Sequence, residues 1–64
     1  MVTRSEVFRR FGPFLNEAMM LVILEEVNVL RSFAGKPPRT EQQMLDQLGN
    51  HSTSLEPYDW MKEE

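Results

Sequence analysis

Histidine and cysteine, two residue types that often carry out catalytic chemistry, are scarce in this sequence. Its 64 residues include no cysteine and one histidine, His51, which stands in a short polar stretch. The adjacent carboxylates Glu25 and Glu26 are candidates for general acid–base work. Projection at about 100° per residue places them on different faces of a helix, however, and no histidine or cysteine stands beside them. A catalytic pair is therefore not expected.

Sequence signatures of other enzyme and cofactor sites are absent as well. The chain contains no Gly-rich phosphate loop, nucleophile elbow, CxxC or HExxH pattern. A single histidine without cysteine cannot assemble a metal site with other nitrogen or sulfur ligands. We also expect a chain this short to leave no room for a pocket. The sequence thus predicts a non-enzymatic protein with no cofactor and no bound metal.

Glu26 is singled out by its position among apolar residues. On a helical projection it lies about 20° from Leu15 and Phe33, inside an apolar arc. An unpaired carboxylate in an apolar interface costs several kcal/mol. If that face is buried, Glu26 must be neutral, bound to backbone donors, or paired with Arg31, Arg39 or an arginine of a neighbouring chain. If the helix is less buried there, Glu26 reaches water.

The centre of the chain predicts one long helix over residues 13–34, stopped by Gly35. Seven consecutive apolar residues, 18–24, make it more apolar than the surface helix of a small monomer. Ten of its apolar residues form two adjacent stripes, one of Leu15, Met19, Val22, Val29 and Phe33, the other of Met20, Ile23, Val27, Leu30 and Ala34. Phe14, Leu21 and Leu24 lie outside both stripes. The chain itself can cover one stripe, so the other is expected to bind a partner. The partner-binding candidates on this helix are Leu15, Met19, Met20, Val22, Ile23, Glu26, Val27, Leu30 and Phe33.

Two shorter helices flank this central helix in the predicted all-α fold. Thr3 with Glu6, and Thr40 with Gln43, have the spacing of capping boxes, which predicts helices over residues 4–11 and 41–49. The third helix is expected to pack back on the central one as an αα-hairpin. Residues 1–54 then form a single helical domain, followed by an acidic aromatic tail, 55–64, that is irregular or a short helix.

Charge is unevenly distributed in this acidic chain, whose formal net charge is −3. Arg4, Arg9 and Arg10 make the first residues basic, whereas the tail is acidic. The net charge has the wrong sign for neutralising phosphates, so nucleic-acid binding through the three arginines is only a minor alternative. Charged and polar residues interrupt the apolar segment before it reaches the about 20 residues of a membrane span. No membrane association is expected.

The tail holds the only tyrosine and the only tryptophan, Tyr58 and Trp60. These residue types are enriched at interface hot spots. One hypothesis is that the tail docks into a basic or grooved partner. The other is that it folds back over the central helix and covers Leu21 or Leu24.

The sequence favours a structural or assembly subunit whose central helix is buried by other copies or by a larger complex. The alternative is a small regulatory protein that binds a cellular or host enzyme through its aromatic tail. As a tiny cysteine-free helical chain with excess apolar surface, it resembles small structural or accessory subunits of larger assemblies, phage particles among them. That resemblance assigns no residues. Without a signal-peptide pattern, the expected location is the cytoplasm, a virion or another large assembly.

Overall fold

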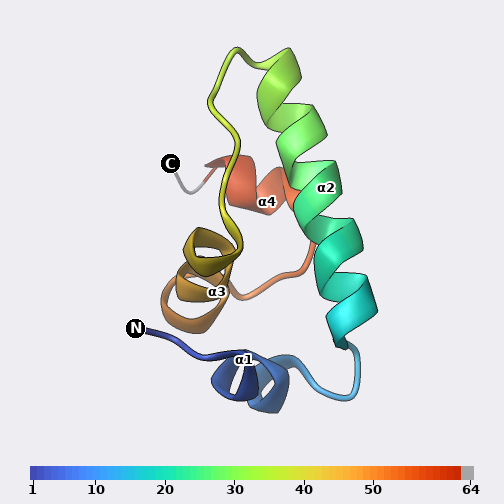
Figure 1. Cartoon of the computed structure of the whole chain (residues 1–64), viewed down its shortest axis with the longest axis vertical. Coiled ribbons are helices and arrows are strands. Elements are labelled where there is room, and N and C mark those ends of the chain that lie inside the picture. Colours follow the sequence, from blue (N-terminus) through green and yellow to red (C-terminus); the bar gives the residue numbers. More distant parts are fainter. Residues whose placement is uncertain (63–64) are drawn as a thin grey trace.

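The computed structural model, which describes residues 1–62, confirms the all-α class. The described residues form four helices and no strand: α1 (Arg4–Phe11), α2 (Glu17–Phe33), α3 (Glu41–Asn50) and α4 (Pro57–Lys62). In Figure 1, α2 runs the length of one side of the molecule, and the three shorter helices lie on its other side. Most of the described part of the tail, residues 57–62, is therefore a short helix, one of the two forms predicted for it.

Local capping signals determine where the first three helices begin. The Thr3 hydroxyl accepts a hydrogen bond from the Glu6 amide at 3.3 Å, and α1 starts at the predicted residue. At α3, Thr40 accepts from the Gln43 amide at 3.2 Å, and the Thr40 amide donates to the Gln43 side chain at 2.8 Å. Both halves of the predicted capping box are thus present, and α3 begins at residue 41 as expected.

The central helix is shorter than predicted, because it begins at Glu17 instead of Pro13. The Phe14 amide donates to the Phe11 carbonyl at 3.0 Å, so residues 11–14 form a turn, in which the Gly12–Pro13 peptide bond is cis. Asn16 then adopts an extended backbone, and its side chain accepts from the Met19 amide at 2.9 Å. Asn16 is therefore the N-cap, and the helix cannot extend back through it.

The predicted pairing of the third helix with the central one is wrong. The helices that pack together are α2 with α4 and α1 with α3. The segment between α2 and α3 returns along α2, as Figure 1 shows, because the Asn28 side chain donates to the Arg39 carbonyl (3.1 Å) and accepts from its amide (2.7 Å). Arg31, also on α2, donates to the Pro37 carbonyl at 2.7 Å. The connection between α2 and α3, together with α4, therefore lies on the side of α2 against which α3 would pack in an αα-hairpin.

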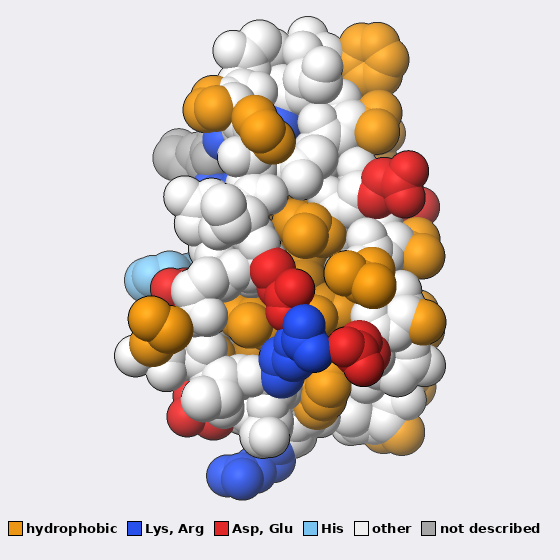
Figure 2. All heavy atoms as spheres, viewed as in Figure 1, with side chains coloured by type: hydrophobic (Ala, Val, Ile, Leu, Met, Phe, Trp, Pro, Cys, Tyr) orange, Lys and Arg blue, Asp and Glu red, His pale blue; other side chains and the backbone are white. Residues whose placement is uncertain are grey.

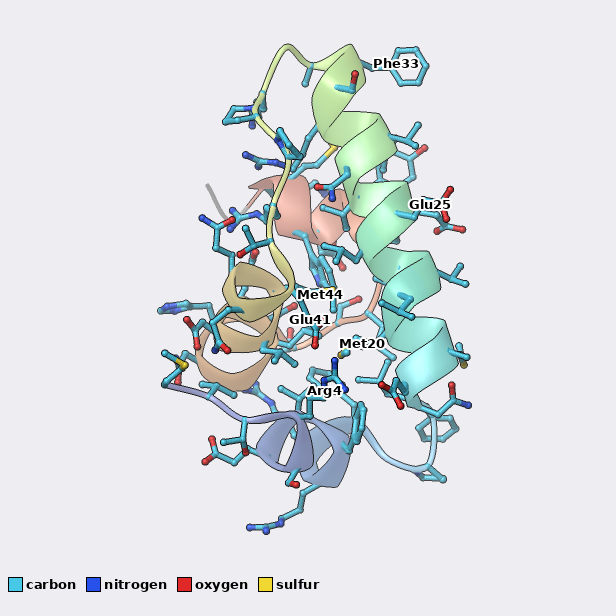
Figure 3. The ribbon with its side chains drawn as sticks, in the orientation of Figure 1. Arg4, Met20, Glu25, Phe33, Glu41 and Met44 are labelled. Atoms are coloured by element: carbon cyan, nitrogen blue, oxygen red, sulfur yellow. The ribbon has the colours of Figure 1, made fainter. Side chains whose placement is uncertain are left out.

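One hydrophobic core joins all four helices and the N-terminal segment. In Figure 3, Met20 of α2 and Met44 of α3 lie in the interior of the molecule between their helices. The buried apolar residues are Val2, Val7, Leu15, Met20, Ile23, Val27, Met44, Leu45, Leu48 and Trp60. Because this core draws on every helix, the helices support one another although each is short.

Arg4 links three helices at the end of the molecule that holds α1. Its guanidinium donates to Glu41 of α3 and to Glu17 of α2, with an N···O distance of 2.7 Å in each case. Figure 3 shows Arg4 reaching from α1 toward Glu41. The hydrogen bond to Glu41 and the charges of both carboxylates raise the pKa of Arg4. The arginine therefore serves the fold by holding the starts of α2 and α3 to α1.

Asp46 ties the N-terminal segment to α3. Its Oδ1 atom accepts a hydrogen bond from the Val2 amide at 3.1 Å and from the Gln42 side chain at 2.9 Å. Gln42 also donates to the Val2 carbonyl at 2.9 Å. The bond from Val2, and after it the bond from Gln42, lower the pKa of Asp46 from its ordinary value of 3.8.

We expect the Asp46→Asn variant to lose less stability on acidification than the wild type. A carboxyl group whose pKa is depressed in the folded state contributes stability above its unfolded pKa and loses it as the pH falls through the folded pKa. Asparagine can accept the same bonds without titrating. Urea unfolding followed by circular dichroism, at several pH values from about 5 downward, measures the difference. Parallel pH profiles for the two proteins would contradict the role given to Asp46.

Candidate protein-binding surface

The chain buries most of one of the two apolar stripes predicted on the central helix and leaves most of the other in solvent. Met20, Ile23 and Val27 of one stripe are buried, and the helix packed on α2 is α4. The other stripe, apart from Leu15, retains 45–86% of its accessible surface. We call its four exposed members the exposed stripe: Met19, Val22, Val29 and Phe33. In Figure 2, hydrophobic side chains follow the α2 edge of the molecule with acidic side chains between them, and Figure 3 shows Phe33 projecting outward.

Five residues named as partner-binding candidates lie inside the molecule. They are Leu15, Met20, Ile23, Val27 and Trp60. A partner could reach these side chains only if the fold opened. Leu30 is half-buried, and the remaining candidates, Met19, Val22, Glu26, Phe33 and Tyr58, are exposed. The surface available for binding is therefore made from the exposed stripe and its neighbours.

The aromatic tail folds back on its own chain as α4. The Trp60 indole nitrogen donates to the Ser54 carbonyl at 2.9 Å, and Gln47 of α3 donates to the Trp60 carbonyl at 3.3 Å. Trp60 is buried, whereas Tyr58 on the same helix keeps 65% of its surface in solvent. Leu24 packs against the core, but Leu21 remains exposed. The described part of the tail thus covers α2, and its two aromatic residues have different environments.

Glu26 takes the second of the two environments considered for it, because it is exposed. Arg31 instead donates to the Pro37 carbonyl, and the Arg39 main chain bonds to Asn28. Within residues 1–62, the side chains of Glu25 and Glu26 make no hydrogen bond or ion pair. Figure 3 shows Glu25 pointing away from α3 into solvent. Both carboxylates are thus available on the surface beside the exposed stripe.

An open groove of about 590 Å³ adjoins the exposed stripe, contrary to the expectation that so short a chain has no pocket. It lies between α2 and the beginning of α4. Its lining residues are Val22, Glu25, Glu26, Val29, Leu30, Glu56, Pro57 and Tyr58. Their side chains include three carboxylates and no lysine or arginine. The groove therefore combines an apolar lining with concentrated negative charge.

Sequence reasoning named residues on both sides of this groove but only half of its lining. Val22, Glu26 and Leu30 of α2 and Tyr58 of α4 were among the binding candidates, whereas Glu25, Val29, Glu56 and Pro57 were not. The proximity of Glu56 and Pro57 to α2 follows from the packing of α4, which is set by the burial of Trp60. Of the two hypotheses for the tail, only the one in which it folds back over the central helix predicted that residues of the tail lie beside α2.

The other residues considered for chemistry or binding are dispersed over the molecule. His51 lies in a separate polar depression with Asp46 and is not near the groove lining. In the part of the chain that the structure describes, no cluster of three or more histidine, cysteine or acidic residues is placed to hold a metal ion. Over the same residues, no helix has the length and apolar character needed to cross a membrane.

Two of the three N-terminal arginines are engaged within the fold. Arg4 bonds to two carboxylates, as described above. Arg10 donates to the carbonyls of Leu48 (3.0 Å) and Gly49 (2.7 Å), and its guanidinium carbon lies 5.5 Å from the centroid of the Phe11 ring. These side chains hold helices together, and only Arg9 is exposed without such a contact among the described residues.

Comparison of the chain with protein-family models, with curated proteins and with solved structures found no match in any of the three.

Proposed function

We propose that this protein is a non-enzymatic subunit that binds another protein chain through the exposed stripe of α2 and the groove beside it. Its role is structural, in the assembly of a complex larger than itself. The observation that carries the proposal is the exposure of Met19, Val22, Val29 and Phe33 on one helix whose adjacent apolar stripe enters the core. Exposed apolar side chains gathered on one face and rimmed by polar residues are typical of a protein interaction site.

The size of the molecule also supports a binding role. A chain of 64 residues has a small core, and the chain has no disulfide to reinforce it. Leaving apolar residues in solvent forgoes the stabilisation that their burial would supply, about 25 cal/mol per Å². Binding of a partner over α2 would recover that stabilisation for the complex.

The alternative of a regulatory protein that presents a free aromatic tail has less support. Trp60, the larger of the two aromatic anchors, is enclosed by its own chain. Tyr58 is exposed, but it lines the same groove as Val22 and Val29. A regulatory partner would therefore contact α2 and α4 together, through the surface already proposed.

Site-specific photo-crosslinking tests the proposed function. We expect p-benzoylphenylalanine in place of Val29 to give one adduct of defined mass when the full chain is irradiated in its native cells. The adduct has twice the mass of the chain if the partner is a second copy, and another mass if it is a different protein. The same probe in place of Ser5, which is exposed on α1, serves as the control and should give none. The absence of an adduct from the probe at Val29, or equal adducts from the two positions, would contradict the proposal.

A further inference from the structure

We infer that the groove between α2 and α4 takes a basic amphipathic helix of a different protein. In this arrangement, apolar side chains of the partner contact Val22, Val29 and Tyr58. Lysine or arginine side chains beside them pair with Glu25, Glu26 and Glu56. The inference rests on the proposed function, because it names the kind of partner that binds the exposed side of α2.

The shape of the groove favours a helical ligand. Its volume of about 590 Å³ lies between two helices and accepts several side chains from one face of a third. A peptide that binds as a strand adds to the edge of a sheet, and residues 1–62 contain no strand. Packing of an amphipathic helix against α2 and α4 is the mode that two flanking helices favour.

The charge of the groove determines which helix fits. Three of its eight lining residues are glutamates and none is basic. Within the described residues, these carboxylates have no ion-pair or hydrogen-bond partner among the side chains. An apolar ligand without positive charge would remove them from water without compensation, which is costly. A ligand with flanking lysine or arginine residues would supply the missing counter-charges.

A second copy of this chain does not meet that requirement through α2. Glu25 is the middle residue of α2. Two copies of the helix packed along the exposed stripe, either parallel and in register or antiparallel about the helix centre, would place Glu25 and Glu26 of both copies together. Like charges in a partly apolar contact are unfavourable.

A head-to-tail contact with the basic N-terminal helix of a second copy is also unsuitable. Arg4 is held by Glu17 and Glu41, and Arg10 donates to two carbonyls at the end of α3. Phe8 and Phe11 of α1 pack against the core. The α1 helix would have to leave its own fold before it could present an apolar face and several cations to the groove.

Titration of the full chain with synthetic peptides tests this inference. One peptide is an amphipathic helix with leucines along one face and lysines on both sides of that face. A matched peptide has glutamine in place of every lysine. We expect isothermal titration calorimetry to show binding of the lysine peptide, weakened by added salt, and much weaker binding of the glutamine peptide.

Variants of the chain show whether binding occurs in the groove. Each of Glu25→Gln, Glu26→Gln and Glu56→Gln is expected to lower affinity about two- to fivefold, and the triple variant about tenfold or more. Val29→Ser should weaken binding by a similar factor through the apolar contact. Glu6→Gln, at an exposed position on α1, removes the same charge away from the groove and should leave the affinity unchanged.

The possible outcomes distinguish this inference from the proposed function. Equal binding of the two peptides, or equal losses from Glu6→Gln and Glu26→Gln, would overturn the basic-helix inference and leave the binding surface in place. A crosslinked adduct of two copies through position 29, without peptide binding, would also overturn the basic-helix inference but support the binding surface. The absence of both peptide binding and any adduct would overturn both proposals.

Discussion

Replacing Trp60 with alanine is expected to lower the free energy of unfolding by about 3–5 kcal/mol. Trp60 is almost fully buried and is the largest side chain in the core. Its loss creates a cavity between α2 and α4 and leaves the Ser54 carbonyl without the indole donor. Since a chain of this length has a total stability of about 3–10 kcal/mol, the variant should lose about a third or more of that stability. Urea unfolding followed by far-ultraviolet circular dichroism measures the change.

Two further variants keep this prediction testable if Trp60→Ala does not fold. Trp60→Phe retains much of the apolar volume but loses the hydrogen bond to Ser54, so we expect an intermediate loss of about 1–2 kcal/mol. Tyr58→Ala, two residues away and exposed, should change stability by no more than about 0.5 kcal/mol. Equal and small effects of Trp60→Ala and Tyr58→Ala would contradict the packing of α4 on α2.

Trp60→Ala should also displace the residues of α4 and its start that line the groove. Glu56, Pro57 and Tyr58 reach α2 only because the same helix inserts Trp60 into the core. A surface that depends on a buried anchor is coupled to the stability of that anchor. Binding of a ligand in the groove should in turn stabilise the folded state, because the ligand binds only the folded chain.

The starts and stops of the helices were predictable where one local signal acted alone. Thr3 and Thr40 each precede a helix and accept the hydrogen bond expected from the residue three positions later. Gly35 follows the end of α2 with a φ of +73°, a conformation that glycine adopts without strain. These features depend on a few adjacent residues, so sequence spacing is enough to recognise them.

The start of α2 was mispredicted because two local signals competed. Pro13 is well suited to the first turn of a helix, and it follows Gly12. Asn16 with Glu17 is an equally good N-terminus, since asparagine is a preferred cap and an acidic residue suits the first turn. The Asn16 side chain bonds to the Met19 amide, which decides between the two. Residues 11–14 form a turn, and Leu15 after it is buried in the core. These tertiary features, which the sequence does not display, explain why α2 begins at Glu17 and not at Pro13.

The helix pairing and the second side of the groove were not predictable from local pattern. Periodicity identified an apolar face on residues 41–49 but could not say which helix that face would contact. The choice depends on the path of residues 34–40, which side chains of α2, Asn28 and Arg31, hold against that helix. The groove likewise joins residues about thirty positions apart in sequence. Such contacts arise from the whole fold.

The division of α2 into a buried and an exposed stripe leads to the second large effect, at two adjacent methionines. Met20 is fully buried in the core, whereas Met19 keeps 45% of its surface in solvent. We expect Met20→Ala to lower the free energy of unfolding by about 2–5 kcal/mol. Met19→Ala should lower it by less than about 1 kcal/mol, because it removes less buried surface than Met20→Ala and alanine favours the helix.

Both methionine variants make the same chemical change one residue apart on the same helix, so helix propensity contributes equally to each. Any difference in stability between them, measured by urea unfolding, therefore reports which side of α2 the chain itself covers. Equal losses of the size expected for Met20→Ala would mean that both stripes are buried in the isolated chain, and α2 would then have no free apolar side for a partner. The expected inequality would instead leave Met19, with Val22, Val29 and Phe33, as apolar surface that the isolated chain does not need for folding. That is the condition under which a binding role for the exposed stripe is physically consistent with a stable monomer.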